Sequence, residues 1–213
     1  MVHPRLIESP IEPLARALAG PLPGAAAHAA MTVTPPPVRN RLTEEPPRLG
    51  GVLALLYPLD GELHLALTRR SARLRHHGGQ VSLPGGAQEP GDGTLWRTAL
   101  REAAEEIGII KGDVELVGAL TPVEVPASGY VVHPFVAHAA RRPAFCLQED
   151  EVEELIELPL GALLAPDAKG VEPWQLHDRL ARVPFYRHEG LIIWGATAMI
   201  LSELEAVLRR VVP

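Results

Sequence analysis

Three glutamates in the segment REAAEEIGI, residues 101–109, have the spacing of a metal site. Glu102 precedes Glu105 by three residues and Glu106 by four, so on a helix the three carboxylates project from one face. Like charges at these spacings destabilise a helix, and the negative end of the helix dipole adds to the cost. A hard divalent cation, which prefers oxygen ligands, removes this conflict. The spacing therefore predicts a carboxylate site for Mg²⁺ or a similar ion.

The alternative is an acidic helix face exposed to solvent, with Arg97 and Arg101 paired to the glutamates. The residues upstream favour the metal site instead. Gly85 and Gly86 form a glycine pair that lets the backbone approach a ligand closely, and Asp92 follows in a loop. We therefore expect the glutamates to face a ligand rather than solvent alone.

These residues resemble the signature of the Nudix hydrolase family, which is a glycine, five residues, an acid, seven residues and then Arg-Glu-apolar-x-Glu-Glu-x-Gly-apolar. The second half matches residue by residue from Arg101 to Ile109. In the first half Gly86 and Asp92 fit, but eight residues separate Asp92 from Arg101, and the strict position falls on Gly93. The resemblance implies a site for Mg²⁺ or Mn²⁺ built from the three glutamates, and it leaves Asp92 without an assigned role.

Segment 65–86, LALTRRSARLRHHGGQVSLPGG, carries four arginines and no acidic residue. It resembles a narrower pattern, LLTxRSxxLRxHxGQVxFPGG, of the Nudix branch that hydrolyses coenzyme A, and that branch tolerates the additional residue before Arg101. With later landmarks the resemblance covers about residues 51–210. It implies a substrate diphosphate held by the guanidinium groups, because arginine matches the geometry of phosphate oxygens; surface decoration on a turn is the alternative. The substrate-binding residues predicted are Arg70, Arg75, Gln80, Gly85 and Gly86.

One carboxylate must take a proton from the attacking water. Glu105 is a candidate on the helix, and the resemblance implies a further carboxylate from a later loop. Within the acidic run 149–157 we expect this to be Glu151, with Glu154 as second candidate; otherwise the run is a solvated strand entry. Arg101 is predicted to orient a glutamate rather than to contact substrate.

The elements that position these residues follow from hydrophobic periodicity. A helix is predicted from Thr94, its N-cap, to Ile107, with Gly108 ending it. Asp60-Gly61 predicts the turn of a hairpin. The predicted strands are 52–57, 63–67, 114–120, 131–137, 151–158 and 192–194, and a final helix covers 196–212. The predicted fold class is α/β with a mixed β-sheet flanked by helices, and the resemblance implies the Nudix α/β/α sandwich.

Residues 1–48 are predicted to be an arm preceding a Nudix domain at 49–213. Within the arm we expect a short helix over 13–19 and an extended, polyproline-II-like stretch over 20–37. The longest run without a charged residue, 17–38, contains five prolines, so it cannot form a membrane-spanning helix and is a poor signal peptide.

The formal net charge of −6 argues against a nucleic-acid coat, which needs a basic surface. A single cysteine, Cys146, excludes an internal disulfide framework and a zinc site with several thiolates; it is expected in the core. The chain is thus predicted to be a cytoplasmic enzyme whose partner is a small phosphorylated molecule, with a homodimer also considered. The rival interpretations are the same chemistry on ADP-ribose or NADH, a Nudix-fold binding module without turnover, and a structural protein.

Overall fold

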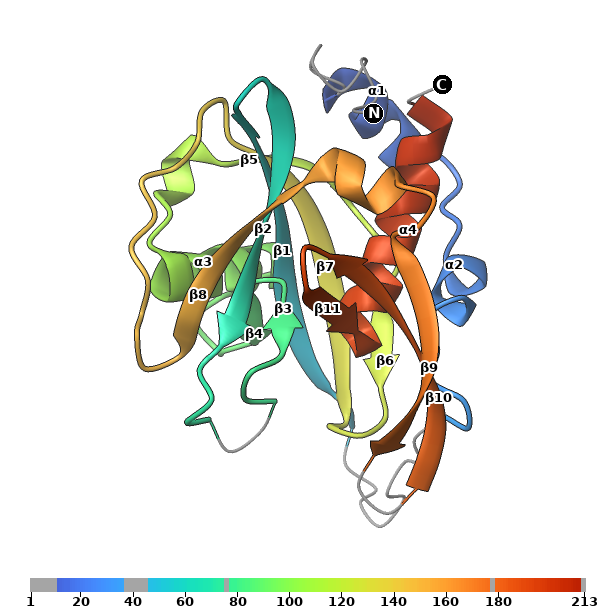
Figure 1. Cartoon of the computed structure of the whole chain (residues 1–213). Coiled ribbons are helices and arrows are strands. Elements are labelled where there is room, and N and C mark those ends of the chain that lie inside the picture. Colours follow the sequence, from blue (N-terminus) through green and yellow to red (C-terminus); the bar gives the residue numbers. More distant parts are fainter. Residues whose placement is uncertain (1–10, 37–45, 75–76, 177–178, 212–213) are drawn as a thin grey trace.

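A computed structural model of the chain describes residues 11–36, 46–74, 77–176 and 179–211 (Figure 1). The α-helices are α1 (Ile11–Leu18), α2 (Ala25–Ala29), α3 (Leu95–Ile107) and α4 (Gly195–Val211), and the 3₁₀ helices are η1 (Lys111–Asp113) and η2 (Leu160–Leu164). The strands are β1 (Arg48–Leu59), β2 (Glu62–Arg70), β3 (Val81–Ser82), β4 (Gly85–Ala87), β5 (Glu115–Ala119), β6 (Val123–Val125), β7 (Tyr130–His138), β8 (Val152–Pro159), β9 (Lys169–Leu176), β10 (Arg179–His188) and β11 (Leu191–Trp194).

Strand β1 is the centre of an eight-stranded mixed sheet. It pairs antiparallel with β2 and β4 and parallel with β7. The sheet runs in the order β3-β2-β1-β7-β5, with β8 beside β2 and β6 beside β7, while β9, β10 and β11 form a smaller antiparallel sheet. The predicted mixed sheet and the β1–β2 hairpin are confirmed.

Alternation along β1 builds a core on each face of the large sheet. Leu53, Leu55 and Tyr57 belong to the cluster that packs against α3, whereas Ala54 and Leu56 belong to the cluster that packs against α4. All five are fully buried, because successive side chains of a strand point to opposite faces. The result is a layered arrangement with helices on both sides of the sheet (Figure 1).

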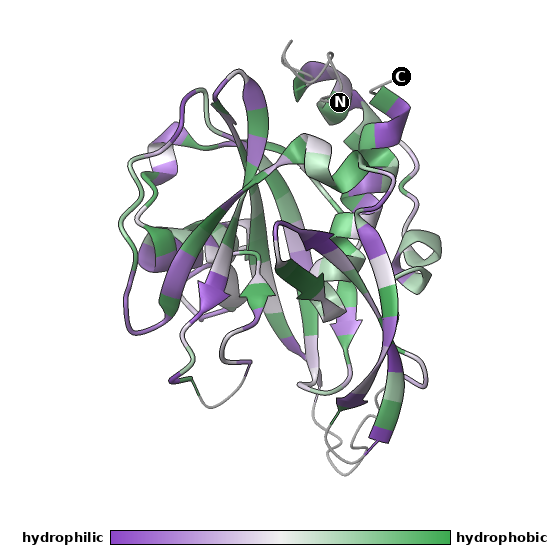
Figure 2. Ribbon diagram, viewed as in Figure 1, coloured by the Kyte–Doolittle hydropathy of each residue, from purple (hydrophilic) through white to green (hydrophobic). Residues whose placement is uncertain are grey.

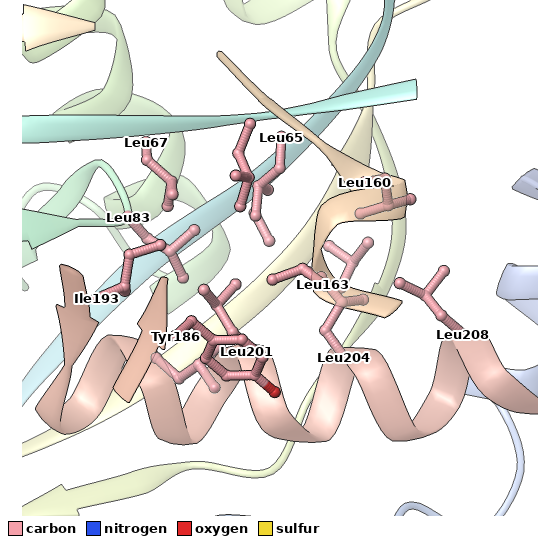
Figure 3. Packing of buried hydrophobic residues seen from close by; sticks show 14 of the residues in the cluster. Leu65, Leu67, Leu83, Leu160, Leu163, Tyr186, Ile193, Leu201, Leu204 and Leu208 are labelled. Atoms are coloured by element: carbon pink, nitrogen blue, oxygen red, sulfur yellow. The ribbon is translucent and has the colours of Figure 1, made fainter. Parts of the chain in front are cut away.

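Helix α4 closes one face with the apolar stripe predicted from the sequence. Ala198, Leu201, Leu204 and Leu208 have no exposed surface. Figure 3 shows leucines of this helix pointing toward side chains of the sheet, and Figure 2 shows α4 as alternating hydrophobic and hydrophilic bands. Burying each leucine stabilises the fold by roughly 1.5–3 kcal/mol relative to exposure. Among the described segments, no helix has the length and apolarity needed to cross a membrane.

Helix α3 has the ends predicted for it. The Thr94 hydroxyl oxygen accepts a hydrogen bond from the backbone N–H of Arg97 at 3.3 Å. At the other end Gly108 adopts the left-handed conformation, and its N–H donates to the Ala104 carbonyl at 3.1 Å. These caps fix where the helix carrying the three glutamates begins and ends.

The small sheet contains two strands that the sequence did not predict. Residues 169–176 and 179–188 form the pair β9–β10, although Pro173 and several charged residues interrupt an alternating pattern there. Strand β9 lies at an edge of its sheet, where proline is tolerated because the missing N–H faces no partner.

The prediction of an extended stretch over 20–37 is wrong at residues 25–29, which form α2. Helices α1 and α2 both pack on α4, and Leu14, Leu18 and Met31 are buried in the same core as the sheet. Packing against α4 stabilises a five-residue helix that is too short to be stable alone. The domain boundary at residue 48 stays a prediction, but the core includes residues that precede it.

A buried carboxylate on α4 fastens this N-terminal segment. The side chain of Glu203 is fully buried and accepts hydrogen bonds from the backbone N–H of Gly24 at 2.8 Å and of Thr121 at 2.9 Å. The Thr121 hydroxyl donates to the same carboxylate at 2.7 Å, and the His28 ring nitrogen lies 3.2 Å from it. One side chain thus joins α2, α4 and the loop after β5.

Glu203→Ala is expected to lower the free energy of unfolding by about 3 kcal/mol, because several buried donors lose their acceptor. Urea unfolding at pH 7 measures this. Glu12→Ala is the matched control, since the Glu12 side chain is 90% exposed and its pair with Arg16 spans 3.9 Å; its effect should stay within about 0.5 kcal/mol. Similar effects of the two substitutions would contradict the role given to Glu203.

Candidate active site

The glycine pair predicted to approach a ligand lies directly against helix α3. Pairing of β4 with β1 sets Gly86 opposite Gly51. The backbone N–H of Gly85 donates to Glu106 Oε2 at 3.2 Å. A Cβ added at Gly86 would lie 2.5 Å from the carboxyl group of Glu102, so a side chain at this position would displace that carboxylate. The sequence thus brings two of the three glutamates onto the backbone of β4.

Glu106 is the most strongly perturbed carboxylate of the site. Its side chain is almost completely buried, and burial raises its pKa from 4.5 to about 7. Arg70 and the Gly85 N–H act in the opposite direction, while the negative charges of Glu102 and Glu151 raise the pKa further. Burial also raises the pKa of Glu102, and the negative charges of Glu105 and Glu151 raise it further. The carboxylates of α3 and Glu151 therefore influence one another electrostatically.

Arg101 holds the acidic side chains around it by three separate contacts. Its Nε donates to Asp92 Oδ1 at 2.8 Å, its Nη2 lies 3.0 Å from Glu102 Oε1, and its Nη1 donates to Glu105 Oε2 at 3.0 Å. The hydrogen bond to Asp92 is the main cause that raises the pKa of Arg101. This geometry agrees with the predicted orienting role of Arg101, which stays a prediction.

Glu105 differs from the other two glutamates. Its side chain is 60% exposed and makes the i,i+4 ion pair with Arg101, whereas Glu106, one residue later, is buried. The three carboxylates of α3 therefore differ in exposure to solvent, which increases from Glu106 through Glu102 to Glu105.

Asp92 is the residue to which the sequence assigned no role. It is buried, and its carboxylate accepts hydrogen bonds from Arg101, from the Thr98 hydroxyl at 2.9 Å and from the backbone N–H of Glu89 at 2.9 Å. The hydrogen bond from Arg101 lowers the pKa of Asp92 well below its usual value. The five-residue interval between Gly86 and Asp92 is the sequence feature that points to Asp92. The additional residue between Asp92 and Arg101 departs from the family signature and hid this role.

Arg70 reaches the buried carboxylate from the opposite side. Its Nη1 lies 3.5 Å from Glu106 Oε1. The pairing of β2 with β8 shifts register between Arg69 and Arg70, and the next residue, Ser71, donates its N–H to the Glu151 carbonyl at 2.8 Å. This irregularity brings Arg70 and Glu151 toward the glutamates of α3. The second candidate, Glu154, instead accepts a hydrogen bond from Arg69 Nε at 2.9 Å.

A further predicted substrate residue, Gln80, lies between β2 and β3. The side chain of Gln80 interacts with the His77 ring, with Nδ1 and Oε1 3.0 Å apart, and its backbone carbonyl accepts from the Arg70 N–H at 2.9 Å. Gln80 therefore supports the end of β2, where Arg70 lies. Arg75 lies outside the described residues.

The expectation that Cys146 is a core residue is wrong, since this cysteine is exposed. Its backbone, rather than its side chain, makes the internal contact. The Cys146 N–H donates to the Ile107 carbonyl at 3.0 Å, and a Cβ on Gly108 would lie 2.7 Å from the cysteine Cβ.

The donor set fits a hard divalent cation. Within the described ranges, no group of three or more His, Cys, Asp or Glu side chains is already arranged to hold a metal ion. The coupled carboxylates nevertheless offer only oxygen ligands, and their mutual repulsion is what a cation would relieve. Mg²⁺ needs few protein ligands, because it retains waters and accepts phosphate oxygens of the substrate.

Comparisons with known proteins agree with this site. The NUDIX domain family model matches residues 47–179. The chain belongs to the Nudix family. Uncharacterized Nudix hydrolase NudL of Pectobacterium atrosepticum is 40% identical over 140 residues, which cover 66% of this chain and 72% of that protein. Its counterpart in Photorhabdus laumondii is 38% identical, over 66% of this chain and 74% of that protein.

The solved structures support the Nudix fold. The crystal structure of MutT protein from Methanosarcina mazei Go1 has a TM-score of 0.51 and 21% identity, covering 79% of this chain and 97% of that one. The predicted Nudix fold is therefore confirmed, and the chain is a Nudix hydrolase by family. Nudix hydrolases in general use divalent cations.

Glu106→Gln is expected to gain stability relative to the wild type as pH rises from about 5 to 8 in the presence of a chelator. The folded wild type holds the Glu106 proton up to about pH 7, whereas the unfolded chain releases it near 4.5, so ionising this buried group destabilises the fold. The free energy of unfolding of Glu106→Gln, taken relative to that of the wild type, should rise by about 3 kcal/mol between pH 5 and pH 8.

Chemical denaturation of both proteins across this pH range measures that difference. Glu105→Gln is the matched control, because its side chain is largely exposed and its difference from wild type should not grow with pH. A constant difference for Glu106→Gln would contradict the raised pKa of this carboxylate.

Proposed function

We propose that this Nudix hydrolase is a Mg²⁺- or Mn²⁺-dependent pyrophosphohydrolase that cleaves the diphosphate of coenzyme A or its derivatives. The products are 3′,5′-ADP and 4′-phosphopantetheine. The observation that carries the proposal is segment 65–86, whose pattern resembles the coenzyme A branch of the family and whose Arg70 lies 3.5 Å from Glu106. An arginine of the segment that resembles the coenzyme A pattern thus lies next to a glutamate of the family signature.

The cation supplies charge neutralisation of the diphosphate and lowers the pKa of an attacking water. In this proposal Glu102, Glu105 and Glu106 are its ligands, with Gly85 and Gly86 shaping the backbone beside them. Arg101 orients Glu102 and Glu105 through its guanidinium group, and Asp92 fixes Arg101 in turn. Asp92 is therefore a positioning residue.

Arg70 and Arg75 bind the phosphates of the substrate in this proposal. The side chain of Arg70 is 27% exposed, and in this proposal its guanidinium contacts Glu106 while presenting further donors to a phosphate. Gln80 acts indirectly, by bonding to His77 and to the backbone of Arg70. We propose Glu151 as the base that takes the proton of water, since its charge already influences Glu102 and Glu106.

A substrate panel with Mg²⁺ and with Mn²⁺ tests the function. We expect coenzyme A to have the highest kcat/KM among coenzyme A, ADP-ribose and NADH, and Glu106→Gln to lower kcat by at least about 100-fold, because one metal ligand is lost. Liquid chromatography of the products identifies which bond is cleaved. A preference for ADP-ribose or NADH would reassign the substrate within the family, and wild-type activity of Glu106→Gln would remove the metal assignment.

Separate substitutions identify the base. Glu151→Gln is expected to lower kcat about 100-fold or more with little change in KM, as loss of a general base does. Glu105→Gln should instead weaken binding of the cation, visible as a higher Mg²⁺ concentration for half-maximal rate. Glu154→Gln is the matched control in the same strand entry, and it should retain kcat. A larger loss of kcat in Glu105→Gln than in Glu151→Gln would transfer the role of base to Glu105.

A further inference from the structure

A stacked pair of planar side chains stands at the start of two neighbouring strands. Arg48 begins β1 and Tyr130 begins β7, and the parallel register places them side by side. The central guanidinium carbon of Arg48 lies 4.3 Å from the centroid of the Tyr130 ring. Arg48 Nη2 donates to the Ser128 carbonyl at 2.9 Å, and its backbone N–H donates to the Gly129 carbonyl at 3.0 Å. The turn before β7 thus fixes the guanidinium over the ring.

This Arg48–Tyr130 pair adjoins the glutamate site. A Cβ added at Gly50 would lie 3.6 Å from Tyr130 Cδ1 and 2.8 Å from the carbonyl oxygen of Gly86. Gly86 itself lies against the carboxyl group of Glu102. Gly50 therefore lies between the tyrosine ring and Gly86, and Gly86 lies beside the Glu102 carboxyl group. A substrate whose diphosphate lies at the glutamates can extend across Gly50, which has no side chain, to the stacked pair.

The hollow beside the pair has the composition of a site for a planar ring. Its lining includes Pro47, Glu124, Val125, Pro126, Tyr130 and Val131. Most of these groups are apolar and suit the face or edge of a heterocycle. Stacking on an aromatic ring or a guanidinium plane can bind any nucleobase, because every base has a flat π-face. The one acidic side chain, Glu124, accepts hydrogen bonds from an amino group but repels a phosphate.

We propose that Arg48 and Tyr130 form a stacking subsite for the amino-bearing nucleobase of the substrate, with Glu124 facing its exocyclic amino group. The inference rests on the proposed function only in requiring a nucleoside diphosphate derivative. It assigns substrate selection to residues outside both the glutamate helix and the arginine segment. Base-bearing substrates gain affinity here, whereas the chemical step at the glutamates is unaffected.

The experiment compares two diphosphates, the member of the substrate panel that is cleaved best and its analogue in which hydrogen replaces the base. Tyr130→Leu is expected to raise KM for the base-bearing substrate about tenfold, the scale of one lost stacking contact, with kcat unchanged. The KM for the base-free analogue should stay the same. Tyr130→Phe, which retains the ring, should keep wild-type KM for both.

Arg48→Leu should resemble Tyr130→Leu, because half of the stacked surface is lost. An equal rise of KM for both substrates would contradict the subsite and indicate a general disturbance of the turn, and so would unchanged KM for both. A rise with Arg48→Leu alone, shared by the base-free analogue, would make Arg48 a phosphate contact and overturn the proposal. Failure of wild-type protein to cleave any member of the panel would instead contradict the proposed function.

Discussion

Burial of the Glu106 carboxylate between helix α3 and strand β4 is the constraint on which the site depends. A carboxylate with almost no exposed surface is unfavourable unless neighbouring groups compensate for lost solvation. Here the compensation comes from the Gly85 N–H on one side and the Arg70 guanidinium on the other. Both groups must therefore be held in place, and the strands that carry them, β4 and β2, are both partners of β1.

The same constraint explains the glycines next to the site. Where β4 contacts α3, the Glu102 carboxyl group occupies the space that a side chain at Gly86 would need, since an added Cβ would lie 2.5 Å from it. The close approach also brings the Gly85 N–H to the Glu106 carboxylate, and the negative charge of Glu102 raises the pKa of Glu106. A divalent ion bound to phosphates would relieve this repulsion between carboxylates. Stability and proposed catalysis thus depend on the same contacts.

Around these carboxylates there are two kinds of ion pair. Some fix the side chains of the site, and others lie on the surface and fix none of them. Arg101 contacts Asp92, Glu102 and Glu105 and so sets the direction of side chains on α3. By contrast, the pair of Arg69 with Glu154 lies outside, on a half-exposed surface where ion pairs contribute little. Adjacent residues of one strand, Arg69 and Arg70, therefore have different partners, as expected from successive side chains that point to opposite faces.

The sequence by itself determined the helix with its caps, the hairpin, most of the strands and the glutamate face, because these depend on local periodicity and turn chemistry. The family signature also identified the fold and the class of reaction. Local patterns could not find β9 and β10, whose pairing compensates for weak alternation, or the helix at 25–29, which needs α4 to be stable. The exposed position of Cys146 was likewise decided by how its backbone meets the end of α3.

Only the tertiary structure decided how the three glutamates differ. Their spacing is compatible with one common face, but burial by β4 separates Glu106 from the exposed Glu105 and raises the pKa of Glu106 to about 7. It also gave Asp92 its position beside Arg101, since contacts between residues nine apart depend on the path of the intervening loop. Types and spacing of residues define which chemistry is available, whereas long-range packing defines which side chain carries each part of it.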